Sequence, residues 1–142
     1  MSMSACRTYF RARANTIGLR EWKDGFSFSN IPSNIFDKAY HLEPGPGVGV
    51  KLNQNDQEIN FQMIVRIFVK GFRDPASGID TAISLAENLI TEALDPAIRL
   101  TQTTGIKQVT FENVSFEPPL GDNDNLVIAT VQFRVLTILG LT

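Results

Sequence analysis

The sequence contains few of the residues that catalytic and metal-binding proteins commonly use. It has one cysteine, Cys6, and one histidine, His41, in 142 residues. A single cysteine excludes an internal disulfide and a zinc site built from paired cysteines, and no second histidine is present to share a metal. One cysteine also fits a reducing compartment, where disulfides seldom persist. We therefore expect no metal and no cofactor.

Long hydrophobic runs are missing as well. No stretch approaches the roughly 18 apolar residues that a membrane-spanning helix needs, so we expect no membrane contact. No apolar segment follows the first arginine, Arg7, so we expect no secretory signal. With 43% hydrophobic and 20% charged residues, the composition is typical of a globular protein. We find no repeat and no linker, and predict a single domain covering residues 1–142.

The net charge of −2 is unevenly distributed along the chain. Residues 1–25 carry five cations against two anions, and the remainder carries eight cations against thirteen anions. A basic start resembles an organelle transit peptide, but Glu21 and Asp24 follow it without a break, which favours a solvated helix face. Aromatic residues between the arginines admit nucleic-acid binding, yet the acidic remainder argues against it.

Hydrophobic periodicity predicts two helices and four strands. Their predicted order along the chain is a helix from Ser4 to about Lys23, strands at Phe36–Leu42 and Ile59–Lys70, a helix from Pro75 to about Leu94, and strands at Ile106–Phe116 and Leu126–Leu139. A phase break in the third strand predicts a bulge near Glu112-Asn113. The predicted fold is α+β: a mostly antiparallel sheet packed against one long helix, with an additional N-terminal helix.

The stretch Glu43-Pro44-Gly45-Pro46-Gly47-Val48-Gly49 predicts a loop, because prolines lack a backbone donor and glycines are costly to order. The predicted loop continues through polar residues to Gln57. A connection of this length inside a compact domain is usually functional or disordered. Its glycines do not form a phosphate-binding site, because the Walker lysine is missing and a strand follows where a nucleotide fingerprint needs a helix.

Three features invite a catalytic or metal-binding interpretation. His41 has acidic neighbours for acid–base chemistry, and Arg7 beside Cys6 is placed to lower the pKa of a thiol. Neither has a second histidine or an identifiable base, so structural roles are favoured. The segment Asp122–Asn125 resembles a calcium loop but lacks the required glycine and glutamate, which favours a hairpin turn. We predict that the protein is not an enzyme.

The chain has more apolar strand surface than one core needs. Leu136 and Ile138 face away from Val135 in a strand, and Ile64 and Phe68 lie on the nominally polar side of the long strand. Exposed together, such side chains would form a patch of the kind that marks interaction sites. We predict that Ile64, Phe68, Leu136 and Ile138 lie at an interface between subunits. The alternative is that the first helix covers this second face.

Most of the chain from Ile31 onward resembles the tail terminator proteins of long-tailed bacteriophages. The similar segments are Ile31-Pro32, Phe36–Glu43, the long strand to Lys70-Gly71-Phe72, Asp74-Pro75 with the helix it opens, Val109-Thr110-Phe111 and Val127–Phe133. The basic N-terminal segment has no counterpart in this pattern. The same pattern also fits other neck or head–tail connector proteins.

The resemblance implies a homohexameric ring without cofactor or catalytic residues. Such a ring caps the tail tube, ends its polymerisation and offers a surface to a head-completion or connector protein. It implies a location in the tail or neck of the virion after assembly in the host cytoplasm, and DNA passing through the lumen without specific binding. We place the tail-tube contact on the predicted loop, at Glu43, Lys51, Asn53, Asn55, Asp56 and Glu58. A different possibility is a small-molecule binding or enzymatic domain with a cavity between helix and sheet.

Overall fold

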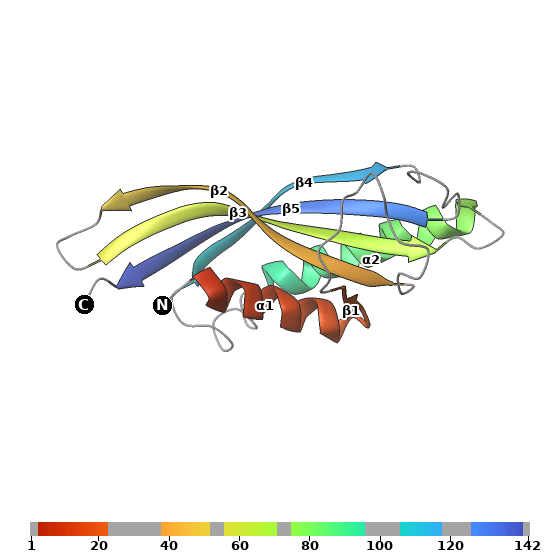
Figure 1. Cartoon of the computed structure of the whole chain (residues 1–142), viewed down its shortest axis with the longest axis horizontal. Coiled ribbons are helices and arrows are strands. Elements are labelled where there is room, and N and C mark those ends of the chain that lie inside the picture. The colour runs from red at the N-terminus through yellow and green to blue at the C-terminus, as the bar shows by residue number, and fades with distance from the viewer. Residues whose placement is uncertain are drawn as a thin grey trace.

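The structure, a computed structural model, describes residues 3–22, 38–51, 56–70, 75–95, 106–117 and 126–140. The described elements are α1 (Met3–Thr16), β1 (Arg20–Glu21), β2 (Ala39–Lys51), β3 (Asp56–Lys70), α2 (Pro75–Leu94), β4 (Ile106–Glu117) and β5 (Leu126–Gly140). The strands form one sheet in the order β1-β2-β3-β5-β4. β1 is parallel to β2, whereas the other neighbours pair antiparallel. The protein is therefore α+β, with a mixed five-stranded sheet and two helices (Figure 1).

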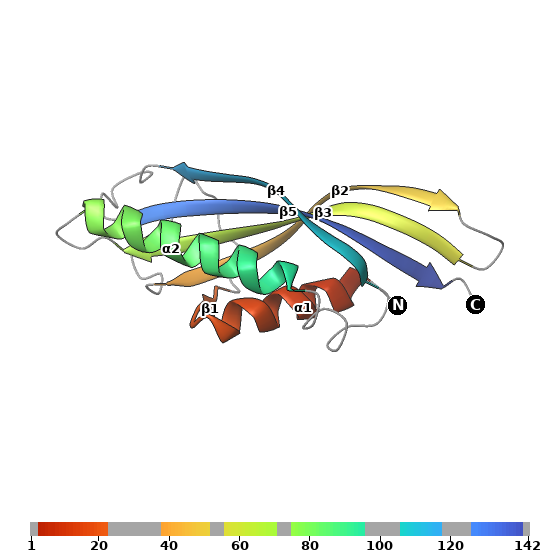
Figure 2. The ribbon, with the colours of Figure 1, turned by 180° about the vertical axis from the view of Figure 1, so that it is seen from behind.

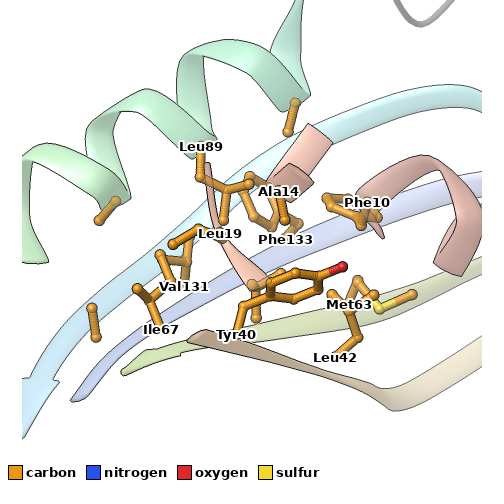
Figure 3. Close-up of a cluster of buried hydrophobic side chains, with 14 of the residues drawn as sticks. Phe10, Ala14, Leu19, Tyr40, Leu42, Met63, Ile67, Leu89, Val131 and Phe133 are labelled. Carbon is orange, nitrogen blue, oxygen red and sulfur yellow. The ribbon is translucent and has the colours of Figure 1, made fainter. Parts of the chain in front are cut away.

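Both helices pack on the same face of the sheet (Figures 1 and 2). Phe10 of α1 contacts Phe133 of β5 with ring centroids 5.0 Å apart, and Leu89 of α2 is buried in the same core (Figure 3). α1 contacts β1 and β2 and also reaches β5 through Phe10, while α2 contacts β3, β5 and β4. The first helix therefore does not cover the second face of the sheet.

The N-terminal helix is shorter than the sequence pattern predicts. α1 ends at Thr16, and the prediction that it continues to about Lys23 is wrong. The amide of Gly18 donates to the carbonyl of Asn15 (3.1 Å), and the amide of Leu19 donates to that of Ala14 (3.1 Å). These two bonds and the φ of 90° at Gly18 form a Schellman motif, which caps the last carbonyls of the helix. The chain can then turn directly into β1.

The two central strands follow the predicted alternation. β3 and β5 pair along their whole lengths, from Asp56 opposite Gly140 to Lys70 opposite Leu126. The buried side chains on their helix-facing side are Phe61, Met63, Val65, Ile67 and Val69 of β3, and Val127, Ala129, Val131, Phe133 and Val135 of β5. The predicted bounds of the second helix are also confirmed, because α2 spans Pro75–Leu94.

The bulge predicted near Glu112-Asn113 is present in β4. The register of β4 against β5 shifts between Phe111 and Asn113. Phe111 is opposite Phe133 and Val114 is opposite Val131, so both side chains lie on the helix-facing side despite their different parity. Glu112 is the extra residue.

Residues 43–51 of the predicted loop are instead part of β2, and Asp56 and Gln57 begin β3, so the prediction is wrong for these residues; residues 52–55 lie outside the described part of the chain. β2 pairs with β3 from Ala39 to Lys51, and its register shifts between Pro44 and Gly47. β1 covers only Ala39 and Tyr40, so the prolines lie on an edge, where a missing donor costs little. A Cβ on Gly47 would lie 2.8 Å from the Cβ of Phe61, so the close strand approach requires glycine. The residues that suggested a loop therefore build a bulged edge strand.

Candidate interaction surfaces

The predicted tail-tube residues do not lie together. Lys51 is opposite Gln57, which places Lys51, Asp56 and Glu58 at one end of the β2–β3 pair. Glu43 lies on the other side of the bulge, opposite Ile64. Asn53 and Asn55 are outside the described residues. The structure thus brings together only three of the six predicted residues.

The end of the β2–β3 pair projects from the body of the protein. Asp56 is opposite Gly140, so the C-terminal end of β5 forms a third strand beside it. Figures 1 and 2 show these three strand ends extending past the N-terminal end of α1. We call this three-stranded projection, made of Gly49–Lys51, Asp56–Glu58 and Ile138–Gly140, the β arm.

The sheet face opposite the helices carries paired polar side chains. Arg66 of β3 forms an ion pair with Glu43 of β2. Glu112, in the bulge of β4, accepts from Gln62 (3.3 Å) and from Arg134 (3.3 Å). Arg134 also donates to Asn60 (3.3 Å). These contacts cross the face from β2 to β4.

The residues predicted for the subunit interface differ in their exposure. Ile64 and Leu136 are half-buried on the face opposite the helices, as their parity predicts. Phe68 is fully buried within the chain, so it has no exposed surface to offer a second subunit and leaves this set. The side chain of Ile138 lies outside the described residues.

Three large apolar side chains of α2 and β4 are exposed. Ile79 and Ile83 of α2 have 44% and 37% of their surface exposed, and Phe116 of β4 has 39%. The N-terminal end of α2 and the C-terminal end of β4 lie at the same end of the molecule, away from the chain termini (Figures 1 and 2). Among the described strands, β4 has a neighbour only on its β5 side. We call this group the α2–β4 side.

Sequence reasoning missed the α2–β4 side, although α2 carries a usable signal. The apolar positions of α2 include Ile79, Ile83, Ile90 and Leu94 in addition to the buried Ala82, Ala86 and Leu89. Such a stripe is wider than the contact that one helix makes with a sheet. Its outer margin must therefore stay exposed unless another element covers it.

The opposite side of the molecule is basic. Arg7 of α1, Arg20 of β1 and Lys38, just before β2, are exposed. Arg11 forms an ion pair with Glu21 of β1, with its Nε 2.8 Å from the carboxylate. We call this region the α1–β1 side.

The two side chains considered for catalysis have pKa values that fit structural roles. Burial raises the pKa of Cys6 to about 11, with a smaller opposing effect from its hydrogen bond with Thr137, so the thiol is protonated at neutral pH. Burial is also the largest influence on His41 and lowers its pKa, while the nearby carboxylate of Glu43 opposes this. Among the described residues, no three His, Cys, Asp or Glu side chains converge as metal ligands would.

Within the described part of the chain, neither helix has the length and apolar character required to cross a bilayer. Comparison with protein-family models and with curated protein sequences gives no match.

Proposed function

We propose that the protein is a structural subunit that assembles with copies of itself into a ring, a hexamer by resemblance, and caps the tail tube of a long-tailed bacteriophage. The ring ends tube polymerisation and presents its other surface to a head-side connector. This proposal combines the sequence resemblance with surfaces suited to assembly. No catalytic step is part of it.

The observation that carries self-association is the exposed apolar α2–β4 side. Full burial of an Ile or Phe side chain contributes about 1.5–3 kcal/mol, so covering the exposed two-fifths of three such residues contributes roughly 2–4 kcal/mol in total. An open strand edge beside such a patch is a liability in a solitary domain. A neighbouring subunit would remove both liabilities at once. Ile64 and Leu136 on the other face stay candidates for a secondary contact.

The β arm is the proposed contact with the tail tube. Lys51, Asp56 and Glu58 at its end offer charges of both signs, and a projecting arm reaches a partner without disturbing the subunit seam. Removing the whole segment Pro44–Gln57 would delete most of a paired strand, so substitutions at the arm are the sharper perturbation.

The part of the face opposite the helices that carries Glu43, Glu112 and Arg134 fits a lumen through which DNA passes without binding, whereas Phe68 and Ile128 on the same face are buried within the chain. Its arginines Arg66 and Arg134 are each bound to a glutamate, and Arg134 also donates to the amide oxygen of Asn60. Arginines held by carboxylates contribute little net attraction for phosphates. This is the proposed orientation of the sheet in the ring.

Negative-stain microscopy of the purified protein, alone and with tail tubes, tests the proposal. We expect rings, and tubes that carry one ring at an end and stop growing. The triple variant Lys51→Glu, Asp56→Lys and Glu58→Lys is expected to form rings that no longer bind tubes, with Thr110→Lys and Ser115→Lys on the sheet face as a control. Tubes that grow unchanged in the presence of the protein would refute the capping function.

The competing small-molecule or enzymatic interpretation requires a cavity between helices and sheet. That region contains the buried aromatic side chains of Phe10, Tyr40 and Phe133, together with Met63 and Leu89 (Figure 3). Large side chains packed in this way favour a structural domain over a ligand pocket.

A further inference from the structure

We infer that the seam between subunits joins the α1–β1 side of one copy to the α2–β4 side of the next. This inference rests on the self-association within the proposed function and assigns the surfaces that carry it. The occupant of the exposed α2–β4 side is a second copy of this chain. Charge complementarity and the orientation of the two helices carry the argument.

The helices have opposite charges. α1 contains Arg7, Arg11 and Arg13 and no acidic residue. α2 contains Asp80, Glu87 and Glu92 and no basic residue. Within one chain they already attract each other, because Arg13 and Glu92 form an ion pair at 3.0 Å. That pair uses only the facing flanks of the two helices.

The outer flank of α2 remains available. At 3.6 residues per turn, Ile83 and Glu92 are about two and a half turns apart, so Ile83 points away from α1. Asp80 and Glu87 are three and four residues from Ile83 and lie on the same side of the helix. Both carboxylates are exposed. The outer flank of α2 is thus both apolar and acidic.

The outer flank of α1 is its complement. Tyr9 contacts α2 through a hydrogen bond from its hydroxyl to the carbonyl of Ala93 (2.7 Å). Arg7 is two residues before Tyr9 and points to the other flank, as does Arg11, whose charge is already paired with Glu21. Lys38 adds an exposed cation beside β1. The long stems of arginine and lysine can cover the isoleucines while their charged ends meet the carboxylates.

These surfaces include opposite edges of the described sheet, because β1 lies at one end of the strand order and β4 at the other. A contact between two different patches is heterologous, and it generates a closed ring when the rotation between copies closes. The same contact would place the open edge of β4 beside the next subunit. The charge pattern therefore favours a head-to-tail assembly over a two-fold dimer.

Paired charge reversals test the seam. The variant Arg7→Glu with Lys38→Glu makes both sides acidic, and the variant Asp80→Lys with Glu87→Lys makes both sides basic. We expect each alone to self-associate with a Kd raised roughly tenfold or more, measured by sedimentation velocity. An equimolar mixture is expected to assemble again, because each acidic side then meets a basic one. Folding of each variant is checked by circular dichroism and thermal unfolding.

A separate variant tests the apolar part of the seam. Ile79→Gln with Ile83→Gln is expected to raise the Kd for self-association by roughly tenfold or more. Thr110→Gln with Ser115→Gln, exposed positions on the other sheet face, is the matched control and is expected to assemble like the unaltered protein.

Three results would overturn the seam: folded reversal variants that assemble as before, a mixture that stays dissociated, or an unaltered protein that is monomeric at high concentration. If the reversal variants still form rings, this assignment of the seam is refuted, but the proposed function is not. If the reversal variants dissociate and their mixture assembles, but tail tubes still grow in the presence of the protein, the proposed seam is supported and the capping function is refuted.

Discussion

Ile83 and Glu92 lie on opposite flanks of α2, and the two flanks have different roles. Glu92 binds Arg13 of α1 and holds the two helices together, whereas Ile83 remains 37% exposed on the side of β4. One flank therefore completes the fold of the chain. The other flank is left for contact with a neighbour.

The close approach of β2 and β3 at the bulge makes a prediction for Gly47. A Cβ at this position meets the Cβ of Phe61 at 2.8 Å, and because that atom is fixed to the backbone of β3, one of the two strands must shift to accommodate it. We expect Gly47→Ala to lower the free energy of unfolding by about 1–3 kcal/mol in urea titrations. An unchanged midpoint of urea unfolding would contradict this close approach of the two strands.

Gly18 supplies a matched comparison, because its constraint is conformational and not steric. A Cβ there has nothing within 4 Å, but the φ of 90° disfavours any other residue. We expect Gly18→Ala to cost about 1 kcal/mol and Gly18→Asn to cost less, since asparagine tolerates the left-handed region better. Equal losses for alanine and asparagine would contradict this explanation.

The docking of α1 on α2 depends on a buried hydroxyl. Tyr9 donates to the carbonyl of Ala93 at 2.7 Å, and the side chain is 2% exposed. We expect Tyr9→Phe to reduce the free energy of unfolding by about 1–2 kcal/mol, because the buried carbonyl loses this donor. Thermal unfolding followed by circular dichroism measures the loss, and a change below about 0.3 kcal/mol would show that the carbonyl finds another donor.

Stability is expected to fall in alkaline solution because of Cys6. Its thiol ionises near 9.0 in the unfolded chain, while burial raises the pKa to about 11 in the folded protein. The folded state binds the proton more tightly, so this contribution is complete below 9.0 and is lost as the pH rises through about 11. Cys6→Ala should remove this part of the pH dependence in urea titrations, and an identical alkaline slope would contradict the assignment.

The remaining alkaline loss in the Cys6→Ala protein is expected to come from Tyr40. Burial, with the nearby Glu21 carboxylate, raises the pKa of Tyr40 to about 12. The loss from this group is therefore expected at higher pH than that from Cys6.

His41 is the single histidine, so NMR reports its titration without ambiguity. Burial lowers its pKa below 6.5, and Arg66 and Arg7 act in the same direction. We expect the midpoint of its ring-proton shifts below 6.5, and stability that falls on the acid side as the pH drops through that midpoint. A midpoint at or above 6.5 would mean that the carboxylate of Glu43 outweighs burial.

Local patterns in the sequence determined the long paired strands, the bounds of α2 and the bulge at Glu112. These follow from the alternation of side chains along a strand, from Pro75 at the start of a helix, and from a phase break that only an extra residue repairs. Each depends on neighbours within one element, so the sequence is sufficient to predict it.

Only the tertiary structure decided that the proline- and glycine-rich segment is an edge strand, that both helices share one face, and that Ile79, Ile83 and Phe116 are exposed. An edge tolerates prolines because no strand needs their missing donors there, and that depends on sheet order. Exposure likewise depends on which element covers a side chain. The apolar pattern shows that a surface avoids water, but the packing of distant elements decides whether the chain itself covers it.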